Sequence, residues 1–284
     1  MLSIDFAGRT LVVTGGLTGI GRGIADLFLK AGANVVIGDI ACPEGTERVH
    51  DRLVHIRTDV TKRADAKRLV AEAADAFGRI DFVVNNSGMS TMDYAVDMRE
   101  EDWDRVMDVN AKGVYLVSQV AAKQLLRQGG GGRIINIASQ AGKNGYRCMG
   151  NYCASKHAVL GFTKVMALEL AKDQILVNAV CPGIVETDMK RRERVEGGLL
   201  RGMTPEEILA EDRSQVPLGR TAEPEDVANV VLFLASPLSS YMTGQATNVT
   251  GGMTMHETGR TENVRGTDRT RSAASRLFVS YRMY

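Results

Sequence analysis

The chain has 284 residues, of which 44% are hydrophobic and 24% charged, and its formal net charge is +1. This size and apolar content suit one large α/β domain, and the near-neutral charge gives no reason to expect nucleic acid or an anionic membrane as a partner. No apolar run approaches the ~20 residues that a membrane helix needs, and the first five residues lack the basic and apolar parts of a signal peptide.

The first predicted elements are a strand at 10–14 and a helix at 19–31, joined by the loop Gly15-Gly-Leu-Thr-Gly-Ile-Gly21. Glycines let a backbone turn sharply beside a pyrophosphate, and a helix N-terminus offers N–H groups and a positive dipole end. The loop lacks the Gly-Lys-Ser/Thr of a P-loop and differs in spacing from G-x-G-x-x-G. We therefore expect a dinucleotide site here, formed by five residues: Gly15, Thr18, Gly19, Ile20 and Gly21.

A second predicted strand at 34–38 ends at Asp39. An acid about twenty residues beyond the glycine loop accepts hydrogen bonds from the adenosine ribose hydroxyls. Its negative charge would repel the extra phosphate of NADP, and the next three residues, Ile40-Ala-Cys42, supply no arginine or lysine. The sequence therefore favours NAD(H), with NADP the less expected cofactor.

Strand and helix patterns alternate along the rest of the chain, which predicts a parallel sheet with helices on both faces. The further predicted strands are 54–57, 81–85, 133–138, 175–180 and 246–249. The further predicted helices are 62–77, 101–127, 151–172 and 224–235.

Ser139 follows the strand at 133–138, and the helix at 151–172 begins with Tyr152 and Lys156, four positions apart. Residues with this spacing lie on one face of a helix. A nearby ammonium lowers the pKa of a phenol towards the range in which it can exchange protons. A hydroxyl at the end of the strand could bind the substrate oxygen that Tyr152 protonates. Taken alone, such a trio occurs by chance in many proteins, and the glycine loop supplies the context that favours a site.

The segment at 189–220 interrupts the alternation at the carboxyl edge of the sheet, where ligands bind. Its basic run, Lys190-Arg-Arg-Glu-Arg194, could attract an anionic substrate such as a sugar phosphate. The pattern favours instead a solvated helix face with Glu193 and Glu196 as ionic partners, because charge runs usually stay in contact with water. Thr204-Pro-Glu-Glu207 predicts a helix start within this segment.

Together these motifs resemble the compact, single-domain branch of the short-chain dehydrogenase/reductase family, over about residues 5–253. The resemblance implies one doubly wound Rossmann-like domain at 1–256, with about seven parallel strands and a substrate lid at about 189–220. Asn85-Asn-Ser-Gly88 matches the family's Asn-Asn-Ala-Gly segment with serine for alanine. Pro182-Gly-Ile-Val-Glu-Thr187 matches the segment that holds the nicotinamide carboxamide.

The resemblance also implies the roles of individual residues. Tyr152 would be the acid/base, Ser139 would orient the substrate oxygen, Lys156 would bind the nicotinamide ribose and lower the pKa of Tyr152, and Asn110 would hold a water of a proton relay. Further cofactor contacts would come from these residues: Asp59, Val60, Asn86, Pro182, Gly183, Val185 and Thr187. Besides Ser139 and Tyr152, Asn144 and Tyr146 could contact a hydroxylated substrate, or they could be plain loop residues.

The expected activity is NAD-dependent oxidation of a secondary alcohol, such as a polyol, sugar alcohol or diol. Segments such as Val216-Pro-Leu-Gly-Arg220 resemble sugar-alcohol and small-diol dehydrogenases. Two alternatives stay open, a reductase of 3-oxoacyl thioesters and a dinucleotide-binding sensor without catalysis. The four catalytic residues argue against the sensor, and Asp39 argues against the usual NADPH dependence of the reductase.

The four cysteines form no C-x-x-C pair and the four histidines have no metal-ligand spacing, so we expect reduced thiols, no metal and a cytoplasmic protein. Residues 257–284 extend beyond the part of the chain that resembles the family. We expect this extension to be disordered or to pack on another subunit. The resemblance implies a homotetramer, with the helices predicted at 101–127 and 151–172 at one interface.

Overall fold

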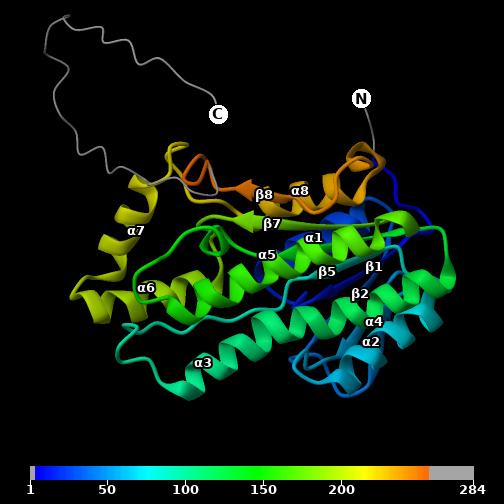
Figure 1. Ribbon diagram of the computed structural model, residues 1–284, viewed down its shortest axis with the longest axis horizontal. Helices are drawn as coiled ribbons and strands as arrows, with labels where there is room; N and C mark the ends of the chain where they lie inside the picture. Colours follow the sequence, from blue (N-terminus) through cyan, green and yellow to red (C-terminus); the bar gives the residue numbers. More distant parts are fainter. Residues whose placement is uncertain (1–3, 256–284) are drawn as a thin grey trace, which may run out of the picture.

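The structure is a computed structural model that describes residues 4–255. Its centre is an eight-stranded sheet in the order β3-β4-β2-β1-β5-β6-β7-β8 (Figure 1). The strands are β1 Thr10–Thr14, β2 Asn34–Asp39, β3 Thr46–His50, β4 Leu53–Arg57, β5 Phe82–Asn85, β6 Gly132–Ile137, β7 Ile175–Pro182 and β8 Ala246–Val249. The helices are α1 Gly19–Lys30, α2 Arg63–Phe77, α3 Glu100–Met107, α4 Gly113–Gln128, α5 Gly150–Leu170, α6 Asp188–Arg201, α7 Pro205–Ser214 and α8 Pro224–Ala235.

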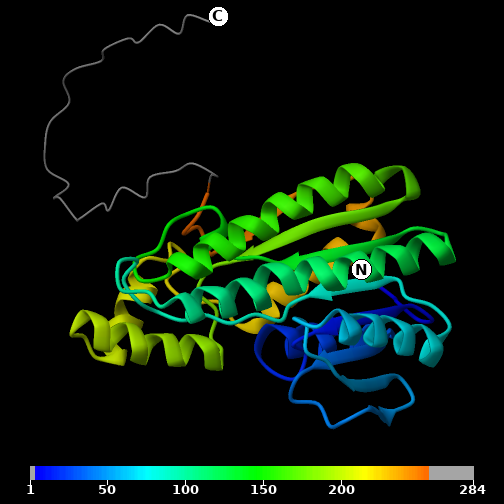
Figure 2. The same cartoon turned by 60° about the horizontal axis from the view of Figure 1, so that its bottom comes forward.

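Two hydrophobic cores lie on opposite faces of this sheet. Val12 of β1 packs in the core that includes α2, α4 and α5, whereas its neighbours Leu11 and Val13 pack in the core that includes α1 and α8. This division follows from the period of two in a strand, which turns successive side chains to opposite faces. Figure 2 shows the resulting three layers, so the predicted doubly wound α/β architecture is confirmed.

The seven predicted strands are all present and parallel, and the structure adds an eighth strand, β3, that the sequence analysis did not predict. β3 pairs antiparallel with β4 at the edge of the sheet, and all five of its residues are exposed. Its sequence, Thr-Glu-Arg-Val-His, does not alternate between buried apolar and exposed polar residues. The strand therefore could not be predicted from the pattern of apolar residues. The other seven strands of the sheet all run parallel to one another.

The helix predicted at 101–127 is divided by one turn of π-helix. α3 ends at Met107, the π-helical turn spans Asp108–Lys112, and α4 begins at Gly113. Such turns are rare and often occur at functional sites. Here the turn carries the buried Asn110.

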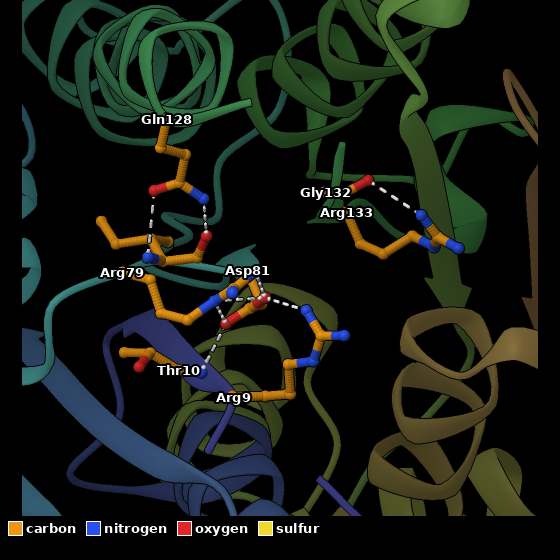
Figure 3. A network of polar contacts seen from close by, with 8 residues as sticks. Arg9, Thr10, Arg79, Asp81, Gln128, Gly132 and Arg133 are labelled. Atoms are coloured by element: carbon orange, nitrogen blue, oxygen red, sulfur yellow. Dashed lines mark hydrogen bonds and ion pairs between the residues drawn. The ribbon is translucent and has the colours of Figure 1, made fainter. Parts of the chain in front are cut away.

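A polar network closes the amino edge of the sheet, opposite the strand ends that carry the predicted site (Figure 3). The carboxylate of Asp81 accepts hydrogen bonds from Arg9 at 2.7 Å, from Arg79 at 2.6 Å and from the backbone N–H of Thr10 at 2.9 Å. Gln128, at the end of α4, accepts a hydrogen bond from the N–H of Ile80 through Oε1 and donates one to the carbonyl oxygen of Ile80 through Nε2. These contacts fix the start of β1 and β5 and the end of α4.

Helices α6 and α7 lie beyond one end of the sheet, the end to which β7 and β8 point (Figure 1). They occupy most of the predicted lid at 189–220. The predicted start of α7 is confirmed, because the Thr204 hydroxyl accepts a hydrogen bond from the N–H of Glu207 and the Glu207 carboxylate binds the N–H of Thr204.

No helix within residues 4–255 is long and apolar enough to cross a membrane. All four cysteines are buried, as expected. The predictions for the extension at 257–284 concern residues outside the described part of the chain.

Candidate active site

One cavity of about 850 Å³ opens along the carboxyl ends of the strands. It begins at the glycine loop and Asp39, passes the ends of β5 and β6, and ends beneath α6 and α7. β1 lies between β2 and β5, which lead to opposite halves of the sheet, and ligands of open α/β sheets bind at this switch point.

The glycine loop is shaped for close approach at two positions. Gly15 and Gly19 have φ values of +64° and +53°, in the left-handed region that favours glycine. A Cβ at Gly21 would stand 2.1 Å from the carbonyl oxygen of Gly15, so a side chain there would push the loop away from α1. Thr18 precedes α1, but its side chain does not cap the helix. Because Thr18, Gly19 and Ile20 line the cavity, the first N–H groups of α1 lie beside a space that could hold a phosphate.

Asp39 is held at the far end of the cavity by backbone donors. Its carboxylate accepts hydrogen bonds from the N–H of Ala41 at 3.0 Å and of Leu17 at 3.3 Å. Asp59 and Val60, after β4, line the same end, together with Ile40 and Thr58, which the sequence did not single out.

Asn86 joins the segment after β5 to the glycine loop. Its amide donates to the carbonyl oxygens of Thr14 and Gly15 at 3.0 and 2.8 Å. Pro182, Gly183, Val185 and Thr187 follow or end β7 and line the opposite wall. All of the residues predicted to contact the dinucleotide, apart from Gly21, therefore border this one cavity, and Gly21 lies directly behind its loop.

Ser139, Tyr152 and Lys156 meet where β6 ends beside the start of α5, and all three line the cavity. Burial and the negative charge of Glu193 raise the pKa of Tyr152. A hydrogen-bonding contact with Ser139 lowers this pKa by less, so the net shift is upward. The phenol is therefore protonated at neutral pH in this structure. The predicted lowering of this pKa by Lys156 is contradicted, because the pKa is raised and Lys156 is not among the groups that shift it, although the Lys156 ammonium lies 5.5 Å from the Tyr152 ring centroid.

Lys156 is almost fully buried and donates to the carbonyl oxygen of Ile137 at 2.8 Å. Burial lowers the pKa of Lys156 to about 8. Its ammonium charge thus titrates much nearer neutrality than that of an exposed lysine.

Asn110 sits behind these groups and lines no part of the cavity itself. Its Oδ1 accepts from the N–H of Met89 at 2.9 Å, and its Nδ2 donates to the carbonyl oxygen of Met89 at 2.9 Å and to Ser155 Oγ at 3.0 Å. The π-helical turn brings this amide against the segment after β5. The contacts that Asn110 makes fix that segment beside Lys156; its predicted role in a water relay stays a prediction.

Of the two additional residues predicted to contact substrate, Tyr146 lines the cavity and Asn144 does not. Burial raises the pKa of the Tyr146 phenol. Asn144 is not among the lining residues, because its amide donates to Thr254 Oγ1 at 3.0 Å. Within residues 4–255 no group of three or more His, Cys, Asp or Glu side chains could hold a metal ion.

The basic run of the lid is neutralised by neighbouring acids. Lys190 pairs with Asp212 at 3.1 Å, Arg192 with Glu196 at 3.4 Å and Arg201 with Glu211 at 2.7 Å. The two remaining arginines of the run, Arg191 and Arg194, are paired as well. These pairs argue against an anion site and confirm Glu196 as a partner, but the run is not a fully solvated face, because Arg194 is buried. The prediction was wrong for Glu193, which forms no ion pair with any described residue and lines the cavity instead.

A glycine loop between β1 and α1, an acid at the end of β2 and a Ser-Tyr-Lys group in one cavity define a dinucleotide-dependent oxidoreductase. A family model described as enoyl-(acyl carrier protein) reductase matches residues 15–254. The chain is 39% identical to the 3-oxoacyl-[acyl-carrier-protein] reductase of Thermotoga maritima, covering 87% of this chain and 98% of that protein. The chain belongs to the short-chain dehydrogenase/reductase family and acts on CH–OH or keto groups.

Two further similar proteins are named for small carbonyl or hydroxyl compounds. The chain is 37% identical to an (S)-acetoin-forming diacetyl reductase of Staphylococcus epidermidis, over 86% of this chain and 98% of that protein. The crystal structure of sorbitol-6-phosphate 2-dehydrogenase from Erwinia amylovora is similar with a TM-score of 0.81 and 31% identity, covering 87% of this chain and all of that one.

Proposed function

We propose that the protein transfers a hydride between NAD(H) and a secondary alcohol or ketone, with a polyol, sugar alcohol or diol as the substrate. The observation that carries the proposal is that Asp39 at one end of the cavity and Ser139, Tyr152 and Lys156 near the other border one continuous space. That space is large enough for a dinucleotide and leaves a lid-covered end for a small substrate.

The choice of NAD(H) rests on Asp39. Backbone N–H groups orient its carboxylate as an acceptor for ribose hydroxyls. A ribose phosphate placed there would meet this negative charge, and the exposed Ile40 next to it offers no compensating charge.

Different residues of the chain would bind the cofactor, orient the substrate and transfer the proton. The bound nicotinamide supplies the hydride chemistry. The N-terminus of α1 and the glycine loop hold the pyrophosphate, and Pro182 to Thr187 hold the carboxamide. Lys156 binds the nicotinamide ribose hydroxyls. Ser139 orients the substrate oxygen, and Tyr152 gives a proton to that oxygen in reduction or takes it in oxidation.

The phenol of Tyr152 needs electrostatic help to act as a base, because burial raises its pKa in the free protein. Lys156 supplies positive charge from the same helix face. Asn110 acts as a positioning residue, since its amide fixes the backbone of Met89 beside the site.

Two measurements test this proposal. Tyr152→Phe should abolish turnover while NADH still binds, which a fluorescence titration of NADH would report. Full activity in this variant would reject the proton-transfer role. The wild-type protein should also have a higher kcat/KM with NAD than with NADP, and about a tenfold preference for NADP would contradict the role given to Asp39.

A 3-oxoacyl-thioester reductase is the second candidate, and similarity to the Thermotoga maritima reductase favours it. Turnover of a 3-oxoacyl thioester with NADPH at a higher kcat/KM than any polyol or diol with NAD would establish that alternative.

We extend the proposal to a homotetramer and a cytoplasmic protein. The outward side of α5 offers support for the assembly, because Leu168 is 83% exposed and Val165 is 50% exposed. Two apolar side chains three positions apart form one strip on a helix, and such a strip suits an interface between copies.

A further inference from the structure

Glu193 is one of four acids of α6 and α7 that line the cavity, and the other three, Asp188, Glu211 and Asp212, are bound in ion pairs. Glu193 lies within the basic run of α6, yet its carboxylate forms no ion pair with any described residue. The neighbouring bases are bound to other acids, as Lys190 is to Asp212 and Arg192 is to Glu196. The cavity beneath the lid therefore carries a carboxylate that no adjacent cation contacts directly.

The position of this carboxylate is fixed from the core side. Ser90, only 3% exposed in the segment after β5, donates its hydroxyl hydrogen to Glu193 Oε1 at 2.6 Å. Arg192 of the same helix donates to the carbonyl oxygen of Ser90 at 3.3 Å. The second oxygen, Oε2, accepts no hydrogen bond from residues 4–255. One oxygen is thus held by the protein, and the other can accept from a ligand.

Glu193 also lies close to the reaction centre. Its negative charge is the largest influence on the pKa of Tyr152 after burial. Glu193 is partly buried, and this burial raises the pKa of its carboxyl. Lys190, Arg192 and Asp212 are the charged groups that face it, and none of them forms an ion pair with it.

A fixed, partly buried acceptor that lines the same cavity as Tyr152 has a defined preference among substrates. A hydroxyl on the carbon next to the reacting one can donate to it, and this hydrogen bond replaces the water that the carboxylate loses when the lid covers the substrate. An apolar substituent leaves the acceptor unsatisfied, and a carboxylate or phosphate is repelled.

We propose that Glu193, positioned by Ser90, is the specificity-determining residue that selects neutral vicinal diols and 2-hydroxyketones by accepting a hydrogen bond from the hydroxyl next to the reacting carbon. This inference rests on the proposed function and names its substrate class more narrowly.

The test compares meso-butane-2,3-diol with butan-2-ol, which differ by this one hydroxyl, in the NAD-dependent oxidation catalysed by the full chain. In wild type, kcat/KM should favour the diol. In Glu193→Met, the kcat/KM for the diol should fall about tenfold or more while that for butan-2-ol is unchanged or rises, so that the preference is lost. Ser90→Ala should weaken the preference partly, because it releases Oε1.

Glu196→Gln is the matched control, since Glu196 lies in the same helix and pairs with Arg192 away from the cavity-facing carboxylate. It should leave the preference unchanged. Glu193→Gln keeps an acceptor without the charge, so it should retain much of the diol preference and turn over 3-hydroxybutyrate better than wild type does.

Thermal shifts measured on the NADH complex give a second readout that does not depend on turnover. The diol should raise the melting temperature of wild type more than butan-2-ol does, and this difference should vanish in Glu193→Met. Equal losses on both alcohols, with equal thermal shifts, would overturn the role of Glu193. Failure of wild type to oxidise either alcohol with NAD, while a 3-oxoacyl thioester is reduced, would overturn the proposed function instead.

Discussion

The guanidinium of Arg194 in α6 binds both carboxylate oxygens of Glu186, in the segment after β7, at 2.8 and 2.7 Å. Its Nε also donates to Asp212 of α7 at 2.9 Å. One side chain, 6% exposed, thus joins both lid helices to the segment that carries Thr187. The Arg194 contact holds the pKa of Glu186 at about 2, far below its ordinary range.

Arg194→Met should therefore disturb the lid and the candidate nicotinamide segment together. It leaves Glu186 and Asp212 without their shared cation, and breaking a buried pair in this way costs about 3–5 kcal/mol. We expect a lower melting temperature, and higher KM values for both NAD and the alcohol. Arg191→Met is the control, because the Arg191 side chain is 63% exposed. Wild-type stability and KM values in Arg194→Met would show that this pair does not hold the lid.

Gly21→Ala should weaken cofactor binding, because the new methyl group would collide with the Gly15 carbonyl and with the amide of Asn86. The glycine loop must then move away from α1, and NADH affinity measured by fluorescence should fall. Gly161→Ala tests the same substitution in α5, where nothing lies within 4 Å of the added Cβ. That control should keep NADH affinity and gain up to about 1 kcal/mol of stability from helix propensity. Equal NADH affinity in the two variants would contradict the close packing of the loop.

Lys156 should make the stability of the free protein depend on alkaline pH. Burial lowers its pKa from 10.5 to about 8, so the unfolded chain holds this proton more tightly than the folded one between these values. Stability contributed by this group therefore rises as pH increases from about 8 to 10.5, by roughly 3 kcal/mol over the range.

Urea unfolding of wild type and Lys156→Met at several pH values checks this prediction. The difference in unfolding free energy, wild type minus variant, should increase from pH 8 upwards. A difference that is flat with pH would mean that Lys156 titrates as an exposed lysine does.

Leu168→Glu should reduce the mass of the assembly if α5 forms an interface between copies. A carboxylate placed in that apolar strip would have to be buried without a partner, which opposes association. Light scattering coupled to size-exclusion chromatography measures the change. Leu218→Glu serves as a control, because Leu218 is 71% exposed outside α5. Identical masses for Leu168→Glu and wild type would exclude α5 from the interface.

Local chemistry made much of the fold predictable. β1, the glycine loop and α1 follow from an apolar run, a glycine cluster and helical spacing within residues 10–30. The Thr204 start of α7 follows from a capping pattern four residues long. β3 escaped prediction because it is an exposed edge strand whose position depends on pairing with β4.

The sequence by itself determined the alternation of strands and helices, the glycine loop and the spacing of Tyr152 from Lys156, because each depends on residues close together in the chain. Only the tertiary structure decided which acid in the cavity is left without an ion pair, that Asn110 lies in a π-helical turn, and that burial and Glu193 raise the pKa of Tyr152. The physical reason is that hydration, charge and hydrogen-bond partners at these positions come from segments far apart in sequence, such as Ser90 and Glu193.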